Sequence, residues 1–189
     1  VGANTPTATI NTGGTYNYTV TNTNNGCQAI GSVSVTQNNT NPSVAASTSG
    51  SINCVSSTIQ VIASTTATPV SYTWTGPGVV SGANTASATV NAGGTYSYTV
   101  VNALNNCSAT GTVFVNQNTI TPIATASSSG SLNCTTTTVQ TIASTTTTPV
   151  SYNWSGPGIV SGATTASATV NAGGTYNYTV TNTTNNCTA

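Results

Sequence analysis

Five cysteines are the residues of this sequence best able to do chemistry. They stand at Cys27, Cys54, Cys107, Cys134 and Cys187, and the sequence contains no Asp, Glu or His that could share a metal ion with them. It also contains no Lys or Arg that could lower the pKa of a thiol and make it a nucleophile. The cysteines therefore predict disulfides and an oxidising, extracellular location.

Two pairings of these cysteines fit their spacing. In the first, Cys54 pairs with Cys107 and Cys134 pairs with Cys187 at equal separations, which leaves Cys27 to find its partner outside this sequence. The alternative joins Cys27 to Cys54 and Cys107 to Cys134, again at equal separations, and leaves Cys187 over. We favour the first pairing, because each bond then closes a loop within one repeat and stabilises it by about 3 to 4 kcal/mol.

The absence of all charged residues from a chain of 189 residues excludes several functions. General acid–base catalysis needs a proton carrier such as His, Asp, Glu or Lys. Calcium is bound by carboxylates, zinc sites draw on imidazole and carboxylate ligands, and nucleic-acid phosphates are bound by Lys and Arg. We therefore expect a protein that is not an enzyme, with no metal or other cofactor and no nucleic-acid partner. No run of about 20 apolar residues is present, so we expect no membrane insertion.

Aromatic residues could form a platform on which sugars stack. A tryptophan on the third strand of a β-sandwich is more often a core residue, and tyrosines that alternate with valine share the inward face of a strand. We therefore predict that the following residues are core residues: Tyr72, Trp74, Tyr96, Tyr98, Tyr152, Trp154, Tyr176 and Tyr178.

Four asparagines fit the acceptor pattern for N-linked glycans. They are Asn17, Asn153, Asn177 and Asn182, each followed at the second position after it by Thr or Ser. A charge-free surface needs a route to solubility, and covalent glycans on these residues, or on Thr and Ser, would supply one. Glycosylation is a hypothesis that the mass of the native protein tests.

An internal repeat organises the chain. The segment Ser49–Cys54 returns as Ser129–Cys134, and Tyr72–Gly78 returns as Tyr152–Gly158, so the repeat has an 80-residue period. Gly93–Tyr96 returns as Gly173–Tyr176 and also occurs earlier, as Gly13–Tyr16. Because the sequence begins and ends within a repeat, we expect it to be part of a longer array. The predicted domains are a partial repeat at 1–41, a complete repeat at 42–121 and a repeat lacking its last strand at 122–189.

Apolar and small polar residues alternate along several runs of each repeat, which predicts strands. In the complete repeat these runs are Ser43–Thr48, Ser57–Ser64, Val70–Thr75, Thr85–Asn91, Thr95–Asn102 and Ala109–Asn116. Gly and Asn stand between them, as tight turns require. Six or seven short strands with this spacing predict an all-β chain of tandem immunoglobulin-like β-sandwiches. The short linkers Gln37–Pro42 and Gln117–Pro122 predict a semi-rigid, rod-like array.

Four segments of each repeat carry a resemblance to a known family. In the complete repeat they are Ser49–Cys54, Val70–Gly78, Ala92–Val100 and Asn105–Cys107. In this order and with this period they resemble the tandem immunoglobulin-like repeats of large surface adhesins of Bacteroidota, of the flavobacterial gliding-motility type. The resemblance covers the whole sequence and implies secretion, repetition and display on a bacterial surface.

Zero net charge favours association, because charge repulsion is what keeps many proteins apart. We therefore predict a structural protein that forms an extracellular fibre or stalk through end-to-end or lateral contacts between its own sandwiches. The alternative is an adhesin module that binds glycans or surfaces through exposed Thr, Asn and aromatic residues. Buried tryptophans would favour the structural role.

Overall fold

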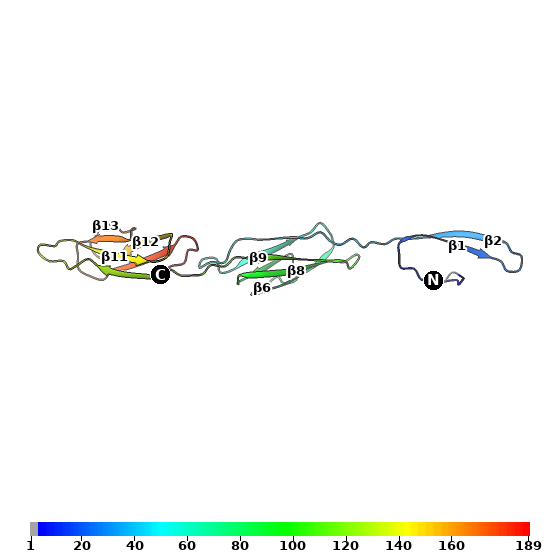
Figure 1. Ribbon diagram of the computed structural model, residues 1–189, viewed down its shortest axis with the longest axis horizontal. Coiled ribbons are helices and arrows are strands. Elements are labelled where there is room, and N and C mark those ends of the chain that lie inside the picture. The colour runs from blue at the N-terminus through cyan, green and yellow to red at the C-terminus, as the bar shows by residue number, and fades with distance from the viewer. Residues whose placement is uncertain (1–3) are drawn as a thin grey trace.

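The protein is built from strands and turns. The computed structural model describes residues 4–189, and these contain fifteen strands and no helix. The strands form three groups that follow one another along the longest axis of the molecule (Figure 1). We call them the N-terminal hairpin (β1 and β2), the middle unit (β3 to β9) and the third unit (β10 to β15).

The N-terminal hairpin consists of two antiparallel strands. β1 (Gly14–Thr21) pairs with β2 (Gln28–Val35) over their full length. By the repeat period these strands correspond to the last two strands of the middle unit. The hairpin has no second sheet to cover its apolar face, so Tyr18 and Val33 are 56% and 53% exposed.

The middle unit contains two sheets. One has the order β3-β4-β7-β6 and the other the order β5-β8-β9. The strand bounds are β3 (Ala45–Thr48), β4 (Ile59–Ser64), β5 (Val70–Thr75), β6 (Val79–Ser81), β7 (Ser87–Val90), β8 (Gly94–Asn102) and β9 (Ser108–Val115). Four plus three strands in this order are the arrangement of an immunoglobulin constant-type sandwich. The prediction of an all-β, immunoglobulin-like unit is therefore met in the middle of the chain.

The third unit repeats this arrangement with one difference. Its first sheet, of order β10-β11-β14-β13, has four strands, but its second sheet, β12-β15, has only two. The bounds are β10 (Ala124–Ser128), β11 (Val139–Thr145), β12 (Val150–Ser155), β13 (Ile159–Ser161), β14 (Ser167–Val170) and β15 (Asn177–Asn182). Of the residues that correspond to β9, the described chain contains Thr188, which bridges Thr181, and Ala189, which exchanges two backbone hydrogen bonds with Val180.

The core of the middle unit lies between its two sheets. Its buried side chains are Ile52, Ile59, Val61, Ala63, Trp74, Ala88, Val90, Tyr96, Tyr98, Val100 and Val115. They alternate with polar residues along each strand, which is the pattern that the sequence presents. The smaller core of the third unit is formed by Ala143, Trp154 and Ala168, with Tyr152 and Tyr178 packed against it.

Both tryptophans lie in these cores. Trp74 is 3% exposed, its ring centroid is 4.9 Å from that of Tyr98, and its Nε1 donates a hydrogen bond of 3.1 Å to the carbonyl of Thr85. Trp154 is 5% exposed and makes the equivalent contacts with Tyr178 and Thr165. The rings are therefore packing residues.

One short strand was missing from the sequence prediction. β6 has three residues and pairs with β7 through an irregular register between Val79 and Ser81. Three residues are too few to produce a clear alternation, and the strand follows directly after the turn at Gly76–Gly78. The other strands of the middle unit fall within the predicted runs or differ from them slightly at an end.

Candidate functional site

The contact region between the middle and third units combines a disulfide with a network of polar contacts. We call it the joint and define it as Ile52–Cys54, Asn116–Ile120 and Asn182–Cys187. The first two segments are held together by parallel pairing. The amide of Ile52 donates to the carbonyl of Asn116 over 2.9 Å, and the amide of Asn118 donates to the carbonyl of Ile52 over 2.9 Å. The end of the middle unit is thereby fixed where the chain passes into the third unit.

A disulfide crosses the joint. Cys54 of the middle unit is bonded to Cys187 of the third unit, with their Cα atoms 5.0 Å apart and a sequence separation of 133. The Sγ atom of Cys54 lies 3.8 Å from the carbonyl oxygen of Thr119. The bond therefore links Cys187, near the end of the third unit, to Cys54, which lies beside Thr119 in the linker that precedes this unit.

Both predicted pairings of the cysteines are wrong for this structure. Cys54 is bonded to neither Cys107 nor Cys27, and Cys187 is not bonded to Cys134. The reason is the length of β9, because Cys107 directly precedes this strand and Cys54 lies beside Thr119, just beyond its end. The eight residues of this strand span about 27 Å, whereas a disulfide needs Cα atoms within about 7 Å. The two cysteines of one repeat therefore lie at opposite ends of the unit.

A buried asparagine reinforces the joint. The Nδ2 group of Asn185 donates to Asn118 Oδ1 over 2.8 Å and to the carbonyl of Ile120 over 2.9 Å. Its Oδ1 accepts the amide of Cys187 over 3.0 Å, and the residue is 1% exposed. All the hydrogen-bonding groups of this side chain are in use, as burial of a primary amide requires. Asn185 therefore fixes both the linker and the backbone at Cys187.

The turn that presents Asn185 depends on asparagines. The amide of Asn182 donates to the carbonyl of Cys187 over 2.9 Å, and Asn182 Oδ1 accepts the amide of Thr184 over 2.9 Å. Asn186 has a φ of 56°, a left-handed conformation that Asn tolerates better than most residues. The sequence Asn-Asn-Cys is therefore a turn that directs its first side chain and its cysteine to the same joint.

The same contacts occur one repeat earlier. Asn105 Nδ2 donates to Asn38 Oδ1 over 3.1 Å and to the carbonyl of Thr40 over 3.0 Å, and Asn105 Oδ1 accepts the amide of Cys107 over 2.9 Å. The middle unit therefore meets the linker that follows the N-terminal hairpin in the way that the third unit meets the middle unit. Two occurrences with the same geometry make the joint a repeated element of the chain.

We predict that Asn185→Asp weakens the joint by about 1 to 3 kcal/mol, because two donated hydrogen bonds are lost and a carboxylate would face two acceptor oxygens in a buried place. The expected result is faster hydrogen exchange at Asn118 and in the turn 182–187, with the core amides of the middle unit unchanged. Thr184→Ala, at an exposed residue of the same turn, is the matched control. Equal exchange in the two variants would show that the Asn185 contacts do not stabilise the joint.

Three cysteines carry free thiols. Cys27 and Cys134 are exposed, and Cys107 is partly buried. By the repeat period Cys134 corresponds to Cys54, whereas Cys27 and Cys107 correspond to Cys187. Each free cysteine therefore stands at a position equivalent to one partner of the observed disulfide.

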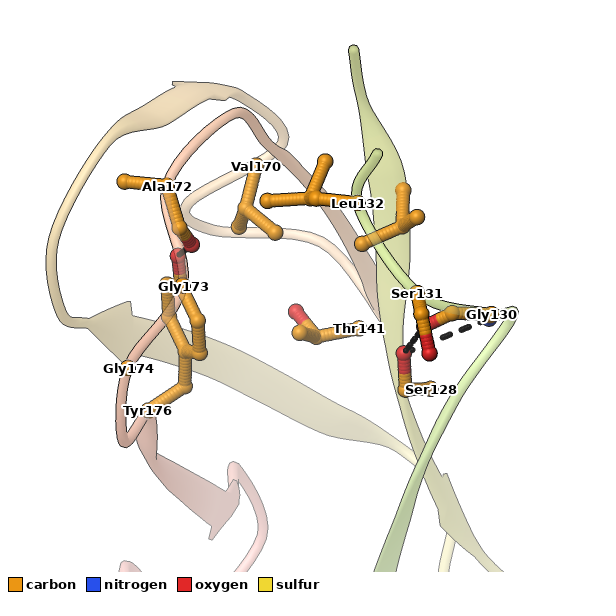
Figure 2. Close-up of a pocket in the computed structure, with 11 residues that line it drawn as sticks. Ser128, Gly130, Ser131, Leu132, Thr141, Val170, Ala172, Gly173, Gly174 and Tyr176 are labelled. Carbon is orange, nitrogen blue, oxygen red and sulfur yellow. Dashed lines mark hydrogen bonds between the residues drawn. The ribbon is translucent and has the colours of Figure 1, made fainter. Parts of the chain in front are cut away.

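An open groove lies at the opposite end of the third unit. It has a volume of about 310 Å³ and is lined by residues of the segment Ser128–Leu132, by β11 and by the segment Val170–Tyr176. Figure 2 shows Tyr176 and Leu132 on opposite sides of it, with Thr141 and Val170 between them. Its wall contains no ionisable group other than the Tyr176 hydroxyl, which donates to the carbonyl of Ala172 over 2.6 Å. The groove is lined by apolar and small uncharged side chains, as a packing surface is.

The remaining predicted residues lie on strands of the hairpin and the two units, except Tyr176, which directly precedes β15. Tyr96 and Tyr98 are buried, while Tyr72, Tyr152, Tyr176 and Tyr178 are partly buried, packed against or beside the cores. Of the candidate glycan acceptors, Asn17, Asn153 and Asn177 are exposed. Asn182 is 8% exposed and its Oδ1 is engaged in the turn, so a glycan at Asn182 is incompatible with the joint.

The environment of Tyr96 shifts its pKa. Burial raises the pKa of the Tyr96 hydroxyl above its usual value near 10, and the hydroxyl donates to the carbonyls of Ala92 and Pro77. A raised folded-state pKa means that this stabilisation is present below about pH 10 and is lost as the pH rises further, because the unfolded chain ionises first.

We therefore expect the free energy of unfolding to fall above about pH 10. In Tyr96→Phe the protein is less stable at neutral pH by about 1 kcal/mol, because the hydroxyl's hydrogen bonds are lost, and its alkaline decline is shallower. Tyr18→Phe, at an exposed tyrosine of the hairpin, should leave the decline unchanged. Chemical denaturation at several pH values measures both, and the same decline in all three proteins would contradict the assignment.

The sequence alone did not identify Asn185, Asn118 or their counterparts Asn105 and Asn38 as joint residues. A usable signal was present, because an asparagine follows the glutamine in both linkers and the Asn-Asn-Cys turn recurs in the next repeat. In a chain so rich in asparagine, however, these residues are not distinguished until the fold places them together.

The described residues, 4–189, include no helix long and apolar enough to span a bilayer. They also include no cluster of three or more residues with metal-binding side chains.

Comparison with known proteins leaves the family of this chain open. No protein-family model matches the sequence, and no curated protein matches it either. Among solved structures, the chain is similar to the three N-terminal domains of the Highly Immunogenic Outer Capsid protein (Hoc) of bacteriophage RB49. The TM-score is 0.40 and the sequence identity 17%, over 79% of this chain and 56% of that chain. This chain spans little more than half the length of that structure, and so low a similarity carries no inference about function.

Proposed function

We propose that this chain is a non-enzymatic, extracellular structural protein whose sandwich units are joined end to end in a bacterial surface fibre or stalk. In this proposal the repeats supply length and stiffness, and their partners are other repeats of the same kind. Covalent glycans on exposed Asn, Thr or Ser residues are a compatible addition.

The observation that carries the proposal is the braced joint. A free linker would allow two units to rotate against each other, but here the Cys54–Cys187 bond joins the two units and Asn185 holds the linker. A covalent bond between neighbouring units limits bending and transmits tension past the linker. Such a joint suits a stiff extracellular fibre, and the alignment of the units in Figure 1 agrees with it.

The surface chemistry supports association between copies. The chain has no Lys, Arg, Asp or Glu with which natural sheet edges are protected against pairing. Its solvent-facing strand residues are mostly Thr, Ser and Asn, which hydrogen-bond to one another without the salt dependence of ion pairs.

Burial of the tryptophans weighs against the alternative of a glycan-binding adhesin module. Trp74 and Trp154 are enclosed between sheets and their indole N–H groups are already bonded, so neither ring offers a face on which a sugar could stack. Large exposed apolar residues do occur: Phe114 lies on β9, and Tyr18 and Val33 share the uncovered face of the hairpin.

The proposal predicts a fibre that resists salt and mild acid. Electron microscopy of unreduced material at low and high salt, and at mildly acidic and neutral pH, should show filaments of unchanged length, because no side-chain ion pair or carboxylate titrates under these conditions. A reducing agent is the matched treatment and should shorten or soften the filaments. Dissociation by salt or mild acid would contradict the proposal.

A further inference from the structure

One stretch of the chain passes from unit to unit without turning back. From Gln28 to Thr48 it comprises β2, the linker and β3, and no turn or bend interrupts it. The equivalent stretch from Ser108 to Ser128 comprises β9, the second linker and β10, and it is likewise uninterrupted. The hairpin and the two units follow one another along the longest axis, so each stretch advances along the molecule (Figure 1). We call Gln28–Cys54, the first stretch with its continuation to the disulfide, the through-strand.

Hydrogen bonds at both ends show that the through-strand crosses the whole middle unit. At one end Asn105, which lies just before β9, donates to the carbonyl of Thr40 over 3.0 Å. At the other end the amide of Ile52 donates over 2.9 Å to the carbonyl of Asn116, just beyond β9, and Ile52 forms a parallel bridge with Gln117. The two segments advance by almost the same number of residues between these contacts. The through-strand therefore runs parallel to β9 and is as extended as that strand.

Prolines help to keep the two linkers extended. Pro42 and Pro122 occupy equivalent positions in them, and both are buried. A proline ring fixes φ at about −65° and disfavours the helical conformation in the residue before it. The linkers therefore resist folding back on themselves.

The disulfide continues the through-strand into the third unit. Cys54 is bonded to Cys187, whose counterpart Cys107 directly precedes β9. Beyond Cys187, Ala189 pairs with β15 as the first residues of β9 pair with β8. A covalent path thus leads along the through-strand, across the bond and into the start of the next strand, and it bypasses residues 55–186.

We propose that the through-strand and the Cys54–Cys187 bond together are the tension-bearing element of the fibre, and that the residues between the two cysteines carry none of the load. The inference rests on the proposed function as a fibre and specifies which part of the chain bears tension. A folded unit yields to force when its non-covalent contacts break, and small domains have little stability to lose. A covalent path that is already extended cannot yield in this way.

The through-strand has almost no slack. A β-strand rises about 3.3 Å per residue, and a fully extended chain reaches at most about 3.6 Å per residue. The strands and linker of this path can therefore lengthen by only about a tenth. The bond joins residues 133 positions apart, and the chain between them would span about 450 Å if it were pulled straight. The disulfide withholds this length from extension.

Extension of single molecules tests the covalent path. The full chain carries a handle at each terminus and is stretched in an optical trap, either oxidised or with the substitution Cys187→Ser. Both forms should first open the N-terminal hairpin, because β1 peels away from β2. The oxidised chain should then show no further unfolding step, whereas Cys187→Ser should release about 450 Å more. Release of this length by the oxidised chain would overturn the inference.

Two controls accompany this measurement. Cys134→Ser removes a free, exposed thiol and keeps the Cys54–Cys187 bond, so it should extend as the unsubstituted chain does. A reducing agent should give the unsubstituted chain the behaviour of Cys187→Ser, because it opens the same bond.

Destabilisation of one sandwich tests whether the units are unloaded. Trp74→Ala weakens the core of the middle unit, where the indole is 3% exposed. Together with Cys187→Ser it should lower the force of the middle unit's unfolding step, but in the oxidised chain it should leave the force–extension curve unchanged. Phe114→Ala, at a 62% exposed residue of the same unit, is the matched control and should alter neither curve. A changed curve for oxidised Trp74→Ala would show that the middle unit bears load, which would overturn the inference.

The outcomes separate this inference from the proposed function. Oxidised chains that resist extension in both tests, together with filaments in electron microscopy of unreduced material, support both. Filaments whose single chains release the bypassed length without reduction would leave the fibre proposal standing and overturn the covalent load path. Absence of filaments under all conditions would contradict the proposed function and, with it, the role of the through-strand in a fibre.

Discussion

Replacement of Cys187 by serine is expected to destabilise the third unit by about 4 kcal/mol. Cys54 lies beside Thr119, so while the middle unit is folded its bond to Cys187 closes the stretch from Thr119 to Cys187, which is the whole third unit. Loss of this closure increases the conformational entropy of the opened unit by an amount that corresponds to this free energy. The unit has little else to offset it, because its second sheet has two strands and its core is small.

Hydrogen exchange of the amides of β12 and β15 measures this effect directly. They should exchange about a hundredfold faster or more in Cys187→Ser, a change of the order that a loss of about 4 kcal/mol permits, while the amides of β4 and β8 change little. Cys27→Ser removes a free, exposed thiol and should leave exchange in both units as it was. Unchanged exchange in Cys187→Ser would mean that the third unit does not depend on its attachment to the middle unit.

Trp74→Ala is expected to destabilise the middle unit by about 3 to 5 kcal/mol. The indole is enclosed between the two sheets, so its removal leaves a cavity together with the lost burial. The carbonyl of Thr85 also loses its donor, and Tyr98 loses an aromatic neighbour at 4.9 Å. A small sandwich has limited stability to lose, and partial unfolding of this unit at room temperature would be consistent with the expected size of the effect.

Phe114→Ala is the matched control for Trp74→Ala. Phe114 lies on β9 of the same unit but is 62% exposed, so its truncation should change the free energy of unfolding by less than about 1 kcal/mol. Denaturation followed by the far-ultraviolet signal of both variants makes the comparison. Similar losses would show that Trp74 is less enclosed than the structure places it, and would reopen the sugar-binding interpretation of the tryptophans.

The strands of this protein could be predicted from its sequence because burial of one sheet face imposes alternation. Val61 and Ala63, or Tyr96 and Tyr98, alternate with polar residues, and each such pair faces the core. The repeat supplied a second source of information, since each strand could be identified twice. β6 escaped prediction because its three residues contain no more than one alternation.

The disulfide could not be predicted from spacing for a reason that lies in the repeat itself. In a periodic chain a bond from Cys54 to Cys107 and the observed bond from Cys54 to Cys187 join the same two kinds of position, and they differ only by one repeat period. Choosing between them requires knowing that β9 carries the chain from one end of the unit to the other between Cys107 and Gln117. The direction of a single strand therefore decides whether the bond lies within a unit or between two units.

The contacts of the joint could not be predicted from the sequence either. Asn38, Asn105, Asn118 and Asn185 are four asparagines among many, and each contact joins residues 65 to 67 positions apart. Their role follows from the antiparallel arrangement of β8 with β5, which returns the Asn-Asn-Cys turn to the start of its own unit. Local sequence predicts the turn, but only the topology predicts what the turn touches.

The account depends on units that are braced to their neighbours, and the disulfide map of the unreduced native protein tests this most directly. Cleavage after aromatic residues and leucine places Cys54 in Thr19–Tyr72, Cys187 in Thr179–Ala189 and Cys107 in Asn105–Phe114. We predict that Thr19–Tyr72 is recovered joined to Thr179–Ala189 through Cys54 and Cys187. Recovery of Cys54 joined to Cys107 in Asn105–Phe114 would mean that each unit closes on itself, and the braced fibre would be contradicted.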